Sequence, residues 1–71
     1  MAFEVEVLDR AGNVDKARFF SRDKATDYLA MAGSTGKNAG GAVVSNGERV
    51  ADFGLMRDGT SLRAARKAQK G

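Results

Sequence analysis

The side chains best suited to chemistry by type and spacing lie at the C-terminal end of the chain. Residues 57–71 hold five cations and one carboxylate, a net charge of +4, whereas residues 1–56 carry −1. Four of these cations follow the i, i+3, i+4, i+7 spacing that forms one stripe on a helix, where like charges repel each other. This pattern predicts contact with a polyanion, nucleic acid above all; the alternative is a solubilising tail. The predicted polyanion-binding residues are Arg57, Arg63, Arg66, Lys67 and Lys70.

The composition argues against catalysis. The chain has no His and no Cys, so the commonest general base, the thiolate nucleophile and the usual zinc ligands are missing. No run of carboxylates matches a calcium loop. A Ser activated by Lys requires a desolvated Lys, and a chain this short builds only a thin core. We therefore predict a binding protein, not an enzyme, with no catalytic residues, metal or cofactor.

Gly36-Lys37 resembles part of a phosphate-binding loop. That motif needs a Gly five positions before the Gly-Lys pair and a Ser or Thr after it, where this chain has Met31 and Asn38. The segment is also expected to leave a helix rather than to begin one. Residues 33–41, with four glycines, are therefore interpreted as a flexible connector.

Phe20 is the second candidate binding residue. Neighbouring strand residues face opposite ways, so Phe19 should point into the core and Phe20 outward. An exposed Phe could stack on a base, anchor a protein partner or be an ordinary exposed apolar residue.

The elements that must position these side chains begin with a hairpin. Apolar and charged residues alternate over 3–8, residues 9–13 read as a turn, and a second strand is expected over 14–20. Glu4 and Glu6 should lie opposite Lys16 and Arg18.

A helix is expected next, over 22–32, with Ser21 as N-cap and Gly33 as C-cap. Residues 42–45 and 48–55 form a second hairpin around Asn46-Gly47, the typical type I′ turn. The predicted fold class is α+β: a ββαββ domain (1–58) with a four-stranded antiparallel sheet in the order 2-1-3-4 and one helix on one face. The other face should be solvated or form an interface. The expected core comprises Phe3, Val5, Val7, Ala17, Phe19, Ala25, Tyr28, Leu29, Ala32, Val43, Ala51, Phe53 and Leu55.

A basic C-terminal arm (59–71) completes the chain, with a short helix over 62–70. Its apolar face, mainly Leu62 and Ala65, looks too small to dock firmly. We therefore expect this helix either to fray or to order only on a partner.

The junction Arg18-Phe19-Phe20-Ser21 and the Ala-bearing helix after it, to Leu29, resemble small bacterial and phage hairpin–helix modules. These include the arm-binding domains of phage-type tyrosine recombinases and hairpin–helix–hairpin domains of unknown function. The resemblance covers about residues 3–55 and implies a DNA-binding module. Recombinase arm domains have three strands before the helix, whereas this chain shows two, so no functional residues are carried over.

Together these features predict a small cytoplasmic binding protein of phage or mobile-element type that contacts nucleic acid with little sequence preference. The alternative is an inhibitor or adaptor that binds a host protein with an acidic surface through a sheet edge or the open sheet face. A homodimer through a sheet edge also stays open. No apolar run is long enough to span a membrane, and the N-terminus does not resemble a signal peptide.

Overall fold

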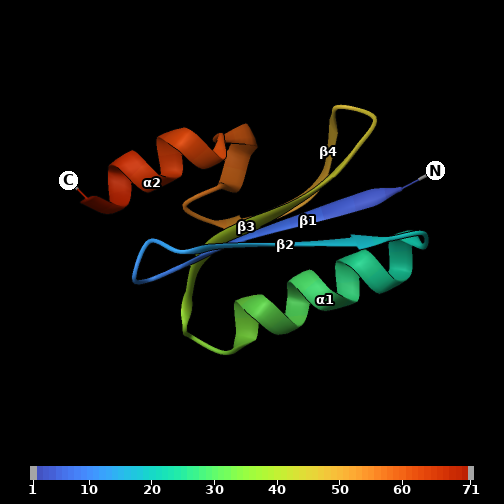
Figure 1. The fold of residues 1–71 in the computed structure, drawn as a ribbon, viewed down its shortest axis with the longest axis horizontal. Coiled ribbons are helices and arrows are strands. Elements are labelled where there is room, and N and C mark those ends of the chain that lie inside the picture. Colours follow the sequence, from blue (N-terminus) through green and yellow to red (C-terminus); the bar gives the residue numbers. More distant parts are fainter. Residues whose placement is uncertain (1, 71) are drawn as a thin grey trace.

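The computed structural model describes residues 2–70, with the side chain of Lys70 outside that description. Its four strands form one antiparallel sheet in the order β2-β1-β3-β4, which confirms the predicted topology (Figure 1). The elements are β1 (Phe3–Asp9), β2 (Val14–Phe19), α1 (Arg22–Ser34), β3 (Asn38–Ser45), β4 (Glu48–Gly54), the 3₁₀ helix η1 (Arg57–Gly59) and α2 (Leu62–Lys70).

The first hairpin has the predicted register. Glu4 pairs with Arg18 and Glu6 with Lys16 across β1 and β2. The Arg18 guanidinium lies 2.9 Å from the Glu4 carboxylate, and the Lys16 ammonium lies 4.0 Å from that of Glu6. The four charges thus form two cross-strand ion pairs, of which that of Glu4 with Arg18 is exposed and that of Glu6 with Lys16 is partly buried.

Helix α1 covers one face of the sheet and closes the first apolar cluster. Ala25 and Leu29 pack against Val5, Val7 and Val43 of the strands. The helix begins as predicted, because the backbone N–H of Lys24 donates to the Ser21 hydroxyl (3.4 Å). Two expected core residues are exposed: Tyr28, whose ring contacts that of Phe19, and Leu55, which follows the end of β4.

The end of α1 differs from the prediction. The helix continues through Gly33 to Ser34, and the positive φ falls on Gly36. Strand β3 already begins at Asn38, so the second half of the predicted flexible connector is regular strand. Gly41 of this strand has no room for a side chain. A Cβ at this position would come within 2.7 Å of the Phe53 ring and 3.0 Å of the Leu29 side chain.

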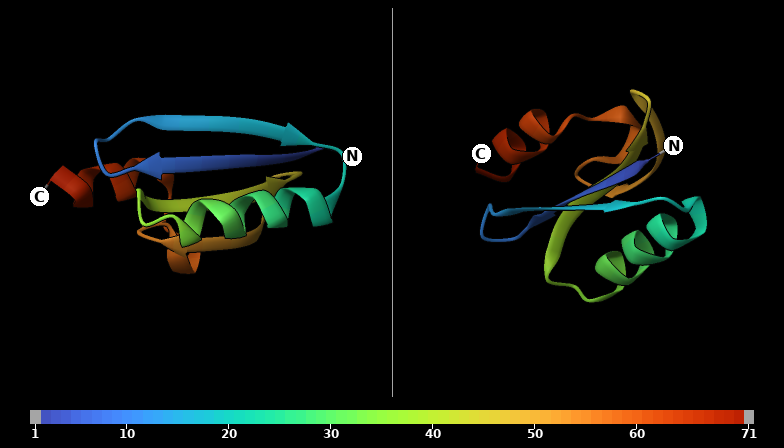
Figure 2. Two further views of the ribbon diagram at one scale, coloured as in Figure 1. Left: turned by 90° about the horizontal axis from the view of Figure 1, so that it is seen from below. Right: turned by 45° about the vertical axis from the view of Figure 1, so that its right-hand side comes forward.

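A second apolar cluster lies on the opposite face of the sheet, beneath α2. Ala65 is fully buried against Leu8, Ala42 and Met56, and Leu62 packs at the margin. The two helices lie on opposite sides of the sheet (Figure 2). The expectation that the C-terminal helix orders only on a partner is therefore wrong. Leu8, Ala42 and Met56 supply the apolar surface that the helix alone lacks, and α2 covers part of the face expected to be open.

The connector between β4 and α2 is held by Arg49. One of its guanidinium nitrogens donates to the carbonyls of Met56 (2.6 Å) and Thr60 (2.9 Å) and lies 3.6 Å from the Asp52 carboxylate. The chain reverses at Asp58 and Gly59, both with positive φ. These contacts set the place where α2 begins.

Candidate nucleic-acid interface

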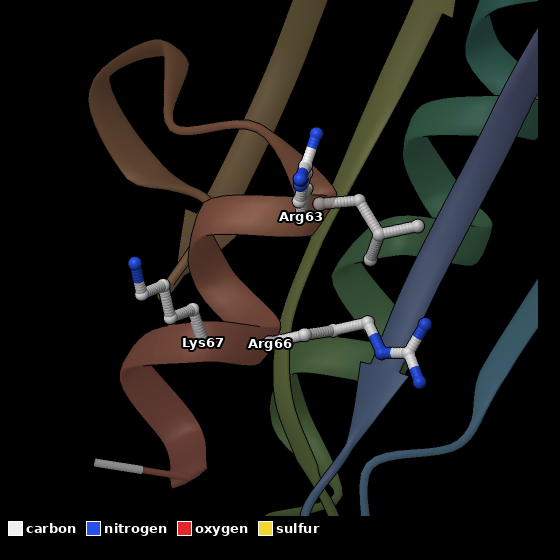
Figure 3. A pocket seen from close by; sticks show the side chains of 4 residues that line it. Arg63, Arg66 and Lys67 are labelled. Atoms are coloured by element: carbon white, nitrogen blue, oxygen red, sulfur yellow. The ribbon is translucent and has the colours of Figure 1, made fainter.

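The predicted basic stripe lies on the outer side of α2. Ala65 points into the second cluster, and Leu62 is half-buried beside it. Residues three and four apart share a helix face, so Arg63, Arg66 and Lys67 fall together, away from Ala65, and all three are exposed. These three cations and Leu62 line a surface pocket (Figure 3).

Three cations of this stripe have no partner among the described residues. Over residues 2–69, whose side chains are described, Arg63, Arg66 and Lys67 form no ion pair and no side-chain hydrogen bond. Lys16 and Arg18, by contrast, are each paired with a glutamate. Residues 59–71 contain no Asp or Glu. The outer side of α2 is therefore a positively charged surface that attracts anions.

The structure brings together three of the five predicted cations. Arg57 is exposed on η1, outside the pocket. Lys70 ends α2, but its side chain lies outside the described part of the chain.

Phe20 is 81% exposed, as predicted, but it follows the far end of β2. That end pairs with Phe3, whereas α2 is bonded to Asp9 at the other end of β1. The six residue steps from Phe3 to Asp9, roughly 20 Å, therefore separate Phe20 from the contact of α2 with β1, so Phe20 does not belong to this surface.

Two features escaped the sequence reasoning. Leu62 lines the pocket between the cations, although it was interpreted only as helix packing. Lys16 and Arg18 lie on the same sheet face as α2. They follow Val14 along β2 at intervals of two residues, and Val14 packs against the second cluster. The expected pairs with Glu4 and Glu6 give these two cations a structural role, and only the docking of α2 shows that they share a sheet face with the basic helix.

Asp9 organises the turn beside the end of α2. Its carboxylate accepts hydrogen bonds from the backbone N–H groups of Asn13 (2.8 Å) and Ala11 (2.9 Å). These bonds, that from Asn13 above all, lower the pKa of Asp9 below its ordinary value of 3.8. The Gln69 side chain donates to the Asp9 carbonyl (2.7 Å), which ties the end of α2 to this turn. Nowhere in residues 2–70 do three or more His, Cys, Asp or Glu residues gather as a metal site.

Comparisons with protein-family models, with curated proteins and with solved structures give no match for this chain. In the part of the chain that the structure describes, none of the helices has the length and apolar character needed to cross a bilayer.

Proposed function

We propose that this chain is a non-enzymatic nucleic-acid-binding protein that contacts the phosphate backbone through the outer side of α2. The observation that carries the proposal is the set of exposed, unneutralised cations on one side of a docked helix: Arg63, Arg66 and Lys67. Cations neutralise phosphates and release condensed counterions, and this release is the main source of sequence-independent affinity.

Three properties follow from this arrangement. Binding tolerates sequence changes, because phosphate contacts carry no base information. Affinity falls steeply with salt. The helix is already fixed by Ala65 and Gln69, so binding does not bear the entropic cost of ordering it.

The test compares two variants that each remove two positive charges. Arg66→Gln/Lys67→Gln alters α2, and Arg22→Gln/Lys24→Gln alters the exposed start of α1 across the sheet. A truncated chain is unsuitable, because loss of α2 would uncover Leu8 and Met56.

Binding to a short mixed-sequence DNA duplex is measured over a sodium chloride series by fluorescence anisotropy. The log–log salt slope of the α2 variant should fall by up to about 1.8, because each phosphate contact contributes about 0.9, and the α1 variant should keep the parent slope. Absence of binding by the parent at low salt, or equal losses in both variants, would refute the proposal.

A protein partner is the second candidate function, and two exposed apolar residues favour it. Phe20 is 81% and Met31 70% exposed, and large side chains of this kind often anchor protein interfaces. Capture from a bacterial lysate with and without nuclease separates the two functions. A stoichiometric protein that survives nuclease, and is lost with Phe20→Ser, would support this second function.

A further inference from the structure

The second sheet face continues beyond α2 as a strip of charge. Val14 and Leu8, which face each other on β2 and β1, lie in the cluster beneath α2. Every second strand residue returns to the same face, so the next two pairs there are Lys16 with Glu6 and Arg18 with Glu4. The side chains of Lys16 and Arg18 are 66% and 64% exposed. They line a second surface pocket together with Glu4 and Ala17.

The basic side of α2 borders this strip. Figure 3 shows Arg66 extending from the helix across β1, while Lys67 points the other way. Strand β2 lies next to β1 at the sheet edge, and Val14 of β2 packs at the margin of the cluster in which Ala65 of α2 is buried. Arg66 of α2 and the β2 cations therefore lie on the two sides of β1 on this sheet face.

The two glutamates determine how strongly this strip attracts an anion. The pair of Glu4 with Arg18 is exposed, with its charged atoms 2.9 Å apart. In the other pair Lys16 is exposed and Glu6 is mostly buried, with a side chain 23% exposed, and their charged atoms are 4.0 Å apart, at the outer limit of an ion pair. Pairs of this kind near the surface are weak, because water screens them and two long side chains must be held in place. A phosphate can thus replace a glutamate as the partner of either cation at little cost.

We propose that Lys16 and Arg18 form a second phosphate-binding row beside α2, and that Glu4 and Glu6 are internal counterions that the nucleic-acid backbone displaces. This inference rests on the proposed function. It enlarges the binding surface from one helix to a helix and the neighbouring edge strand. It also gives the glutamates an opposing role, because their carboxylates lie on β1, between the two rows of cations, and repel phosphates.

The experiment uses the full-length chain, the same DNA duplex and the same salt series. Lys16→Gln/Arg18→Gln removes the second row, and Glu4→Gln/Glu6→Gln removes the internal counterions. Arg22→Gln/Lys24→Gln is again the control with two charges removed. Thermal unfolding followed by circular dichroism verifies that each variant is folded at the temperature of the assay.

Opposite effects are expected from the two sheet-face variants. Loss of Lys16 and Arg18 should weaken binding and lower the salt slope by up to about 1.8, more than the control does. Loss of Glu4 and Glu6 should strengthen binding at low salt by about two- to thirtyfold, the range expected for two charge pairs near the surface.

The outcomes distinguish this inference from the proposed function. If the parent binds and the α2 variant loses binding, but the Lys16/Arg18 variant behaves like the control, the second row is refuted and the function stands. Unchanged or weaker binding by the Glu4/Glu6 variant would refute the counterion role. If the parent does not bind at all, the proposed function itself fails.

Discussion

At the scale of single residues, Gly54 is the position where the fold depends most on the absence of a side chain. Its φ is +61°, and a Cβ would lie 2.2 Å from the Ala39 carbonyl oxygen. Gly54→Ala should therefore destabilise the protein by about 2–5 kcal/mol, from left-handed strain and overpacking together.

Gly47→Ala is the matched control in the same denaturant titrations. Gly47 also has positive φ (+77°), but no atom lies near its missing Cβ, so only the strain of about 1–2 kcal/mol applies. Equal losses at the two positions would show that the contact with Ala39 is unimportant.

Asp9 gives the protein a pH-dependent element. Its pKa is lowered in the folded state, so its contribution to stability is present above the unfolded pKa near 3.8. It is lost as the pH falls through the lower, folded value. Asp9→Ala should therefore be less stable than the parent at neutral pH, and the difference should shrink below about pH 4.

Unfolding by denaturant over a pH series measures this difference. Asp9→Asn is the control: its amide oxygen can still accept the turn hydrogen bonds, but the side chain no longer titrates. A carboxyl pKa for Asp9 at or above 3.8 in an NMR titration would contradict the assignment.

At the scale of elements, Arg49 holds the connector that delivers α2 to the sheet. Its side chain is largely buried, and its guanidinium group donates hydrogen bonds to the carbonyls of both Met56 and Thr60. Arg49→Ala should cost about 2–4 kcal/mol, because hydrogen bonds to charged groups contribute about 1.5–3 kcal/mol each and do not add fully. Faster amide hydrogen exchange in α2 should accompany the loss.

Arg22→Ala serves as the control for Arg49, because Arg22 is exposed at the start of α1. Substitutions at such surface positions usually change stability by less than about 0.5 kcal/mol. Unaltered exchange in α2 after Arg49→Ala would mean that the second apolar cluster alone holds the helix.

At the scale of the whole molecule, two thin clusters share one sheet. The first lies beneath α1 and the second beneath α2. Val7 and Leu8 are neighbours in the sequence and both buried, which is possible only where a strand is covered on both faces. The candidate binding surface and the second cluster are thus two sides of the same helix, so the fold and the proposed function depend on one docking event.

The sequence alone determined what depends on local interactions. Period-two alternation predicted the first hairpin and its ion pairs, Ser21 predicted the start of α1, and Asn46-Gly47 predicted the second hairpin turn, where both residues have positive φ. These features follow from hydrogen bonds and side-chain periods within a few residues. The basic character of α2 was likewise visible in its composition.

Tertiary structure decided the rest, because burial depends on surfaces that distant segments contribute. Whether α2 docks could not be inferred from Leu62 and Ala65, since Leu8, Ala42 and Met56 supply the rest of that cluster. The same docking places Lys16 and Arg18 beside the basic helix. Their charges were evident in the sequence, but their proximity to α2 arises only when strand and helix share one face of the sheet.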